Sequence, residues 1–190
     1  MADKTKIEWT DATWPVTNGC ALESPGCENC YAMKLAHKLG ANPNTPQYAG
    51  LTEVGRHGPR WNGVVRPYEK DINQPLHWKR PRRIFVDSMS DLFHEDVPDA
   101  HIDRVFATML ACELFENRTS HTFQVLTKRA DRMADYMNAP PAELLERWGK
   151  AGDGSITVGD GDTYFSEAVY SHCVARWGDA GIATEPTAPW

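Results

Sequence analysis

The sequence lacks the long apolar segments of a membrane or secreted protein. No run of apolar residues approaches the roughly 20 that a transmembrane helix needs, and no apolar segment of a signal peptide follows the first six residues, Met1 to Lys6. It also has neither a His-Glu-x-x-His segment nor the sharp serine turn of a hydrolase. We therefore expect a cytoplasmic protein that does not contact a membrane, and we do not expect hydrolytic chemistry.

Cysteine is scarce, with five residues in a chain of 190. An odd number in a reducing compartment argues against a disulfide framework. Cys112 and Cys173 lie far from the other three in the sequence. We expect both to be ordinary buried thiols, since cysteine is among the most buried residue types. The remaining three cysteines are close together and require another explanation.

Positive charge is also scarce. The chain carries a formal net charge of −6, which argues against broad, sequence-independent binding to nucleic acid, because such binding neutralises phosphates with lysine and arginine. One basic stretch, Lys79 to Arg83, is the exception, since it holds four positive charges in five residues. It is either a contact for phosphate or nucleic acid or a solvated segment that leads into the next strand.

Three cysteines, Cys20, Cys27 and Cys30, lie in a C-x6-C-x2-C pattern within residues 19–30, here called the cysteine loop. The loop contains turn-forming residues and leads directly into a helical pattern. Thiolates are soft ligands that select iron–sulfur clusters, zinc or copper(I). A structural zinc site usually closes with four protein ligands, whereas a [4Fe–4S] cluster on three cysteines leaves one iron open to a small molecule. The pattern therefore favours a [4Fe–4S] cluster that does chemistry.

Zinc is the main alternative, with His37 as the fourth ligand. His37 follows Cys30 by seven residues, which is about 10 Å along a helix axis at about 1.5 Å per residue. That distance is awkward for two ligands of one ion, although a helix that begins late would shorten it. In this alternative the thiolates only hold the N-terminal loop of a zinc-stabilised binding module, and the protein catalyses nothing.

Strand and helix patterns alternate along most of the chain. Gly40 is expected to end the first helix in the left-handed conformation. Residues 41–81 are rich in Pro, Gly and Asn and predict an irregular excursion with one short element. The strand patterns occupy residues 7–10, 83–88 and 121–127, and the helical patterns occupy residues 31–39, the segment from Pro98 onward, residues 130–137 and residues 141–148.

This alternation predicts an α/β fold of parallel βα units. In a chain of 190 residues we expect a partial, incomplete TIM-like barrel, formed by a domain over residues 1–149. Residues 150–190 are expected to be a Gly- and Asp-rich tail or the start of a missing C-terminal part.

Polar residues follow the second and third predicted strands. In parallel βα folds the chemistry lies beyond the carboxyl ends of the strands, so these residues and the cysteine loop should meet at one edge of the sheet. The serines and aspartates can alternatively serve in turns or as helix N-caps, and the two cations can simply begin a solvated helix. The candidate residues are Asp87, Ser88, Ser90, Asp91, Lys128 and Arg129.

A resemblance to known protein families makes these expectations more specific. A three-cysteine loop that follows a first strand and opens a first helix resembles the cluster loop of radical S-adenosylmethionine (radical SAM) enzymes. The usual spacing there is C-x3-C-x2-C with an aromatic residue before the last cysteine, whereas here the first gap is six residues and Tyr31 follows Cys30. More closely, several segments within residues 5–137 together resemble a phage- and prophage-associated three-cysteine family of unknown function. They are Ile7 to Trp14, the cysteine loop with Tyr31 and Ala32, Ile84 to Phe93, and Phe123 to Arg129.

The resemblance implies an enzyme. It implies that the three cysteines hold a [4Fe–4S] cluster whose open iron binds the amino and carboxylate groups of S-adenosylmethionine. One-electron reduction would then cleave that molecule to a deoxyadenosyl radical, which abstracts hydrogen from a substrate. The methionyl amino group or the ribose would then donate hydrogen bonds to Asp87, Ser88, Ser90 and Asp91. Lys128 or Arg129 would pair with the carboxylate of S-adenosylmethionine.

The sequence does not name the substrate or the oligomeric state. The basic stretch and a similarity to DNA-lesion lyases of the superfamily point to a nucleic acid or a modified nucleoside. Members of the resembled family carry further strand–helix units beyond this point. A third hypothesis is therefore that the chain is a truncated, inactive remnant.

Overall fold

The computed structural model of the chain describes residues 5–114, 119–157 and 163–172. Within them, strands and helices alternate as the sequence predicts, and residues 165–172 are also helical. The strands are β1 (Ala12–Trp14), β2 (Thr17–Asn18), β3 (Thr52–Gly55), β4 (Gly58–Trp61), β5 (Arg66–Pro67), β6 (Arg83–Val86) and β7 (Thr122–Val125). The α-helices are α1 (Tyr31–Gly40), α2 (Asp99–Leu114), α3 (Ala130–Met137) and α4 (Pro141–Gly152), and the short 3-10 helices are η1 (Pro25–Cys27), η2 (Pro46–Tyr48) and η3 (Gln74–His77).

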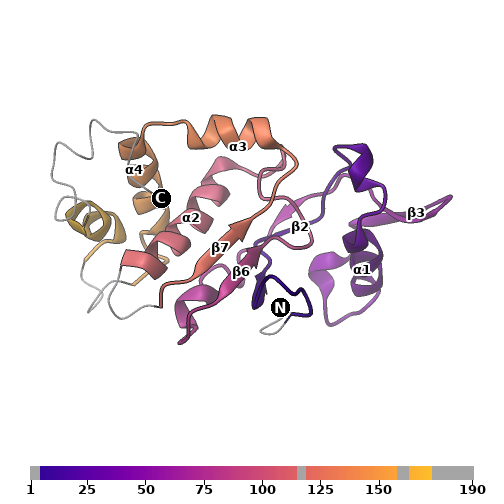
Figure 1. Cartoon of the computed structure of the whole chain (residues 1–190), viewed down its shortest axis with the longest axis horizontal. Helices are drawn as coiled ribbons and strands as arrows, with labels where there is room; N and C mark the ends of the chain where they lie inside the picture. Colours follow the sequence, from indigo (N-terminus) through magenta and orange to yellow (C-terminus); the bar gives the residue numbers. More distant parts are fainter. Residues whose placement is uncertain (1–4, 115–118, 158–162, 173–190) are drawn as a thin grey trace.

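A parallel sheet of three strands in the order β1-β6-β7 forms the centre of the molecule (Figure 1). Ile84 in the middle strand pairs with Ala12 on one side and with Phe123 on the other. This arrangement confirms the predicted mixed α/β fold with parallel strands. The strands described do not close into a barrel. No helix in the described part of the chain is long and apolar enough to cross a membrane.

The first strand lies further along the chain than the sequence predicts. Residues 7–10 form a turn, and β1 begins only at Ala12. The reason is that side chains make the first contacts with β6: the Thr10 hydroxyl donates to the Arg83 carbonyl (2.9 Å), and the Asp11 carboxylate accepts from the Arg83 amide (2.8 Å). The predicted strand at residues 7–10 is therefore wrong by a few residues, whereas the expected cysteine loop still follows the first strand.

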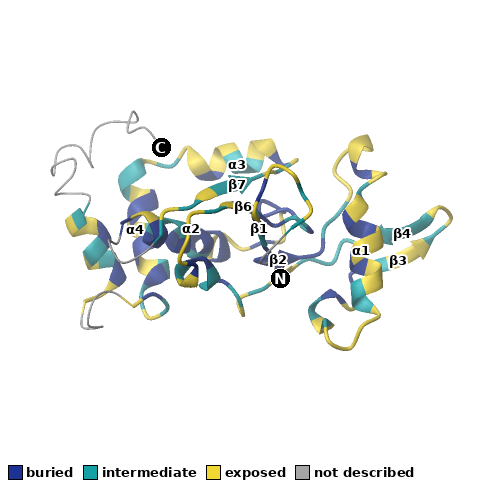
Figure 2. Cartoon of the chain, turned by 60° about the horizontal axis from the view of Figure 1, so that its bottom comes forward, coloured by how far each residue is buried: buried dark blue, intermediate teal, exposed yellow. Residues whose placement is uncertain are grey.

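The main hydrophobic core lies between the sheet and the helices that follow it. Trp14, Ile84 and Val86 are fully buried and belong to the same core as Ile102 and Val105 of α2. Helix α4 packs on the other side of α2, so that α2 is buried around much of its circumference. Figure 2 shows this buried interior beside the more exposed helix α3.

Part of the predicted tail belongs to this core. The predicted domain boundary at residue 149 lies inside α4. Phe165 and Val169 are buried with the core, and a Cβ added to Gly152 would lie only 2.1 Å from the Phe165 ring. Residues 165–172 therefore pack closely against α4. Residues 158–162 of the Gly- and Asp-rich tail and Cys173 lie outside the described residues, whereas Cys112 is buried as predicted.

Residues 41–81 are more regular than the sequence predicts. Strands β3 and β4 pair as an antiparallel hairpin that packs against α1 around a second core at the opposite end of the molecule from α4 (Figure 1). The expectation of one short element was wrong because this hairpin shows no alternation of apolar and polar residues: Val54 is 74% exposed. Gly40 does not end α1 in the left-handed conformation either. It lies inside the helix, where a Cβ would come 2.6 Å from the Tyr48 carbonyl oxygen.

Candidate cofactor site at the carboxyl ends of the parallel strands

A cavity of about 650 Å³ lies at the carboxyl ends of the three parallel strands. Every residue that the sequence marks as a site candidate lines it, although these residues come from three separate segments of the chain. They are Cys20, Cys27, Cys30, Asp87, Ser88, Ser90, Asp91, Lys128 and Arg129. The sequence did not identify the apolar residues Phe85, Leu126 and Met133, which also line the cavity.

The three cysteines line this cavity, and local turns position two of them, Cys27 and Cys30. The Cys27 amide donates to the Ser24 carbonyl (2.8 Å), and the Cys30 amide donates to the Cys27 carbonyl (3.1 Å). Cys30 is the residue that precedes α1, so the last thiol lies at the amino end of that helix. Cys27 is buried, and Cys20 and Cys30 are half-buried.

The thiols differ in their electrostatic surroundings. Burial raises the pKa of the Cys20 thiol to about 11, against the lowering effect of the Arg129 guanidinium beside it. Burial also acts to raise the pKa of Cys27, but hydrogen bonds within the loop and the positive charge of Lys128 together hold it below its ordinary value. Since the thiolate is the form that binds a metal, both cations favour the ligand form of the cysteine beside them.

Asp87 joins the end of β6 to the start of the cysteine loop. It is buried and adopts the left-handed conformation (φ 56°), which is uncommon for a residue other than glycine. Its Oδ1 accepts hydrogen bonds from the Val16 and Thr17 amides, both at 2.8 Å. Its Oδ2 is buried and has no hydrogen-bond partner among the described residues. Burial outweighs the two amide bonds and raises the pKa of Asp87 to about 7.

Ser90 and Asp91 are also occupied by contacts within the protein. The Ser90 hydroxyl donates to the Thr17 carbonyl (2.8 Å). The Asp91 carboxylate accepts from the Thr127 hydroxyl (2.7 Å) and from the Lys128 amide (3.0 Å). These two residues therefore connect the loop after β6 to β2, just before the cysteine loop, and to the loop after β7. The Asp91 carboxylate is therefore taken up by contacts within the protein, whereas the Ser90 hydroxyl uses its proton and keeps its acceptor lone pairs.

Arg129 is buried and surrounded by carboxylates. Its Nε donates to Glu95 (2.7 Å), its Nη1 pairs with Asp91 (3.2 Å), and its Nη2 lies 3.7 Å from Glu23 of the cysteine loop. Glu23 and Glu95 had no distinguishing signal in the sequence, because their partner comes from a distant segment of the chain.

The side chains of Ser88 and Lys128 make no polar contact with other described residues. Within the described residues, neither the Ser88 hydroxyl nor the Lys128 ammonium makes a hydrogen bond or an ion pair, although the Ser88 carbonyl accepts from the Tyr31 hydroxyl (2.6 Å). Lys128 extends over the cysteine loop: a Cβ added to Gly26 would lie 2.9 Å from its Nζ. Both groups therefore lie on the cavity wall with their side chains free to contact a bound molecule.

Three thiols line the cavity, but they are not gathered around one point. No group of three or more His, Cys, Asp or Glu side chains in the described residues is arranged to hold a metal ion. His37, the proposed fourth ligand of a zinc ion, pairs instead with the Thr52 hydroxyl (3.0 Å) and does not line the cavity. A [4Fe–4S] cluster with three cysteine ligands needs three thiolates that face one cavity, and three cysteines line this cavity.

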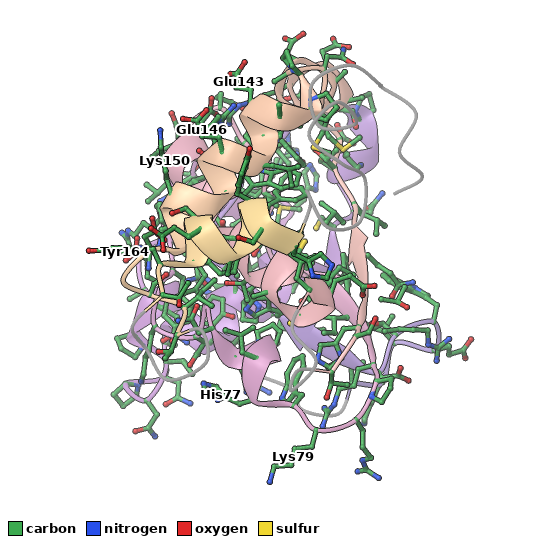
Figure 3. The ribbon with its side chains drawn as sticks, turned by 90° about the vertical axis from the view of Figure 1, so that its left-hand side faces the viewer. His77, Lys79, Glu143, Glu146, Lys150 and Tyr164 are labelled. Carbon is green, nitrogen blue, oxygen red and sulfur yellow. The ribbon has the colours of Figure 1, made fainter. Side chains whose placement is uncertain are left out.

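The basic stretch lies at the other end of β6. Arg83 begins this strand and pairs with Asp11 (3.1 Å), whereas the cavity lies beyond the strand's carboxyl end. The Arg82 guanidinium lies 4.7 Å from the centre of the Trp78 ring. Figure 3 shows Lys79 pointing outward from the fold. The basic stretch does not contribute to the cavity.

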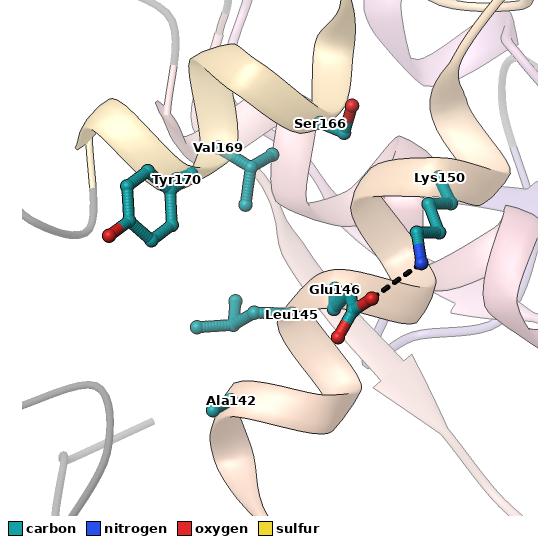
Figure 4. Close-up of a pocket in the computed structure, with 7 residues that line it drawn as sticks. All are labelled: Ala142, Leu145, Glu146, Lys150, Ser166, Val169 and Tyr170. Carbon is teal, nitrogen blue, oxygen red and sulfur yellow. Dashed lines mark hydrogen bonds and ion pairs between the residues drawn. The ribbon is translucent and has the colours of Figure 1, made fainter.

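A second, smaller cavity of about 340 Å³ lies between α4 and residues 165–172 (Figure 4). Its wall is mostly apolar, from Leu145, Val169 and Tyr170, and its charged residues, Glu146 and Lys150, pair with each other. None of the residues predicted for the site lines it.

The fold and the site together define an α/β protein with a cysteine-lined cavity at the carboxyl edge of a parallel sheet. The chain belongs to the family described as protein of unknown function (DUF5131), whose pattern matches residues 4–162. No curated protein and no solved structure matches the chain.

Proposed function

We propose that the chain is a radical-SAM-like protein of phage or prophage origin that holds a [4Fe–4S] cluster on Cys20, Cys27 and Cys30 and cleaves S-adenosylmethionine. One observation carries the proposal: the cysteines and all six other candidates, from three separate segments, line one cavity at the carboxyl edge of a parallel sheet. Active sites of parallel α/β folds lie at this edge. The cavity of about 650 Å³ also falls within the roughly 300–1,000 Å³ of small-molecule and cofactor sites.

We also propose that the three parallel strands are the first part of a TIM-like barrel. The strands are neighbours in the sheet in the same order as in the sequence, β1-β6-β7. Helices follow each of them, namely α1, α2 and α3. Successive βα units that add strands on one side are the repeating step of such a barrel.

Each part of the cavity wall has a role in this proposal. The cluster supplies the electron for cleavage when it is bound. Lys128, with its free ammonium above the cysteine loop, pairs with the methionyl carboxylate, and the Ser88 hydroxyl hydrogen-bonds the amino group or the ribose. Phe85 and Met133 form an apolar surface that excludes water from the reacting atoms. Asp87 accepts two amide hydrogen bonds at Oδ1 and so holds the segment that leads into the cysteine loop.

The class of substrate remains a prediction from the sequence. A nucleic acid or a modified nucleoside follows from the resemblance, but the basic stretch lies at the amino end of β6 and adds nothing to the cavity.

The proposal is tested by the metal content of the protein. The chain is purified without oxygen, and iron, acid-labile sulfide and zinc are measured per chain, in the wild type, in Cys30→Ala and in Cys112→Ala. We expect about four irons and four sulfides in the wild type, lost in Cys30→Ala and kept in Cys112→Ala, whose thiol is buried in α2. Stoichiometric zinc without sulfide would overturn the proposal in favour of a structural module, and a chain with neither metal would indicate an inactive remnant.

A further inference from the structure

The side chains around Arg129 connect the three loops that form the cavity. Arg129 belongs to the loop after β7, and it contacts Asp91 and Glu95 in the loop after β6 (3.2 and 2.7 Å). Its remaining amino group, Nη2, faces Glu23 of the cysteine loop at 3.7 Å and has no closer hydrogen-bond partner among the described residues. A single guanidinium group therefore touches all three loops.

Asp91 supports the same arrangement from the opposite side. Its carboxylate accepts hydrogen bonds from the Thr127 hydroxyl, the Lys128 amide and the Phe93 amide (2.7, 3.0 and 3.0 Å) in addition to Arg129. Both partners are almost completely buried, with side-chain exposures of 7% for Asp91 and 6% for Arg129. A buried ion pair of this kind is costly to break, because removal of one partner leaves an uncompensated charge.

Arg129 also lies beside the thiol that is farthest along the sequence from the other two cysteines. Cys27 and Cys30 are joined by a local turn, but Cys20 has no such link to them. Cys20 and Arg129 line the same cavity, and Glu23, three residues after Cys20, is the residue of the cysteine loop that faces the guanidinium. The planar guanidinium suits this task, because it donates in several fixed directions at once.

We infer that Asp91 and Arg129 form a positioning unit that holds the cysteine loop, through Glu23, against the loops that follow β6 and β7. The attachment of the loop does not depend on what the cysteines bind. That the unit thereby places Cys20 for cluster binding rests on the proposed function.

The chain contains a matched control. Arg147 and Asp103 form another arginine–aspartate pair (2.9 Å), between α4 and α2, and neither lines the cavity. Its removal should loosen the helices without changing the cysteine loop. Any effect specific to the positioning unit is therefore separated from a general loss of stability.

Three variants of the full chain test the inference: Arg129→Gln, Arg129→Lys and Arg147→Gln. Hydrogen exchange of the peptides that cover residues 19–30 is measured by mass spectrometry, together with iron, sulfide and the midpoint potential of the cluster. We expect exchange in the cysteine loop to become roughly tenfold faster or more in Arg129→Gln and to remain as in the wild type in Arg147→Gln. Arg129→Lys keeps the charge with fewer donors and should fall between them.

The cluster provides the second readout. Loss of the positive charge beside Cys20 should lower the iron content or shift the midpoint potential to a more negative value in Arg129→Gln, and Arg129→Lys should restore the potential in part. Cysteine-loop exchange that is unchanged in Arg129→Gln, or equally accelerated in Arg147→Gln, overturns the inference. If the wild-type protein contains no iron and no sulfide, the proposed function is overturned. The hydrogen-exchange measurements on the same proteins then decide the inference without the cluster readout.

Discussion

The substitution Asp87→Asn should change how the stability of the protein depends on pH. Asp87 is 2% exposed, and its Oδ1 accepts the Val16 and Thr17 amides. Asparagine has the same shape and keeps an oxygen for these two bonds, but it carries no charge at any pH. The variant therefore removes the ionisation of this group while it keeps the contacts that hold the cysteine loop.

The direction in which stability changes with pH follows from the direction of the pKa shift of Asp87. Burial raises the pKa of Asp87 to about 7 in the folded chain, and an aspartate in an unfolded chain has a pKa of about 3.9. Below about pH 4 both forms are protonated, and the group adds no pH dependence. Between these two values the unfolded chain has lost the proton and the folded chain still holds it, so the free energy of unfolding falls as pH rises.

The magnitude follows from the size of the shift. At about 1.4 kcal/mol per pKa unit, the loss accumulated between pH 4 and pH 7 is about 4 kcal/mol, and it stays constant at higher pH. Asp87→Asn does not experience this loss. The variant should therefore gain stability relative to the wild type by up to about 4 kcal/mol between pH 4 and pH 8.

Urea unfolding at several pH values measures this difference. Other carboxylates, such as Glu95 with its lowered pKa, titrate in both proteins and cancel in the comparison. Asp11→Asn is a control of opposite sign, because the Arg83 hydrogen bonds lower the pKa of Asp11, so that variant should lose stability relative to the wild type as pH rises. A difference between Asp87→Asn and the wild type that is the same at pH 4.5 and pH 8 would refute the reasoning.

Three further substitutions test the packing and the site. Gly152→Ala places a Cβ 2.1 Å from the Phe165 ring, and this overpacking should cost about 1–3 kcal/mol, seen as a lower melting temperature; an unchanged value would contradict the packing of residues 165–172 on α4. Tyr136→Phe removes a buried hydroxyl that donates to Asp103 (2.6 Å) and accepts from the Trp148 indole (2.8 Å), and urea unfolding should show a loss of about 1–3 kcal/mol. Gly26→Ala displaces only the flexible end of Lys128, because the new Cβ would lie 2.9 Å from its Nζ. The free energy of unfolding should change by less than about 0.5 kcal/mol, while calorimetry on the iron-loaded protein should show affinity for S-adenosylmethionine weakened roughly twofold to fivefold; equal affinity would remove Lys128 from the proposed site.

Hydrophobic periodicity predicted the helices better than it predicted the first strand and the hairpin. Helix α3 begins and ends where the sequence pattern does, at Ala130 and Met137. The hairpin of β3 and β4 was missed, since its strands carry Gly, Pro and charged residues and pair mainly through their backbones. Strand β1 has only three residues, which is too short a segment for a reliable pattern.

The sequence by itself determined which segments carry the chemistry. Cys27 and Cys30 are linked by a local turn of three residues, and parallel βα topology places the ends of successive strands at one edge. The sequence was therefore sufficient to predict that these cysteines and the residues after β6 and β7 would meet.

Only the tertiary structure decided which of those residues pair with other parts of the protein and which remain free to contact a bound molecule. Asp91 and Arg129 are residue types of a binding site, but they pair with each other, and the other donors of Arg129 face Glu95 and Glu23. Lys128, one residue away, is left free above the cysteine loop. A charged side chain that the fold buries needs a partner of opposite charge. Which partner it finds depends on the distances between segments that are far apart in the sequence, and the local sequence does not contain those distances.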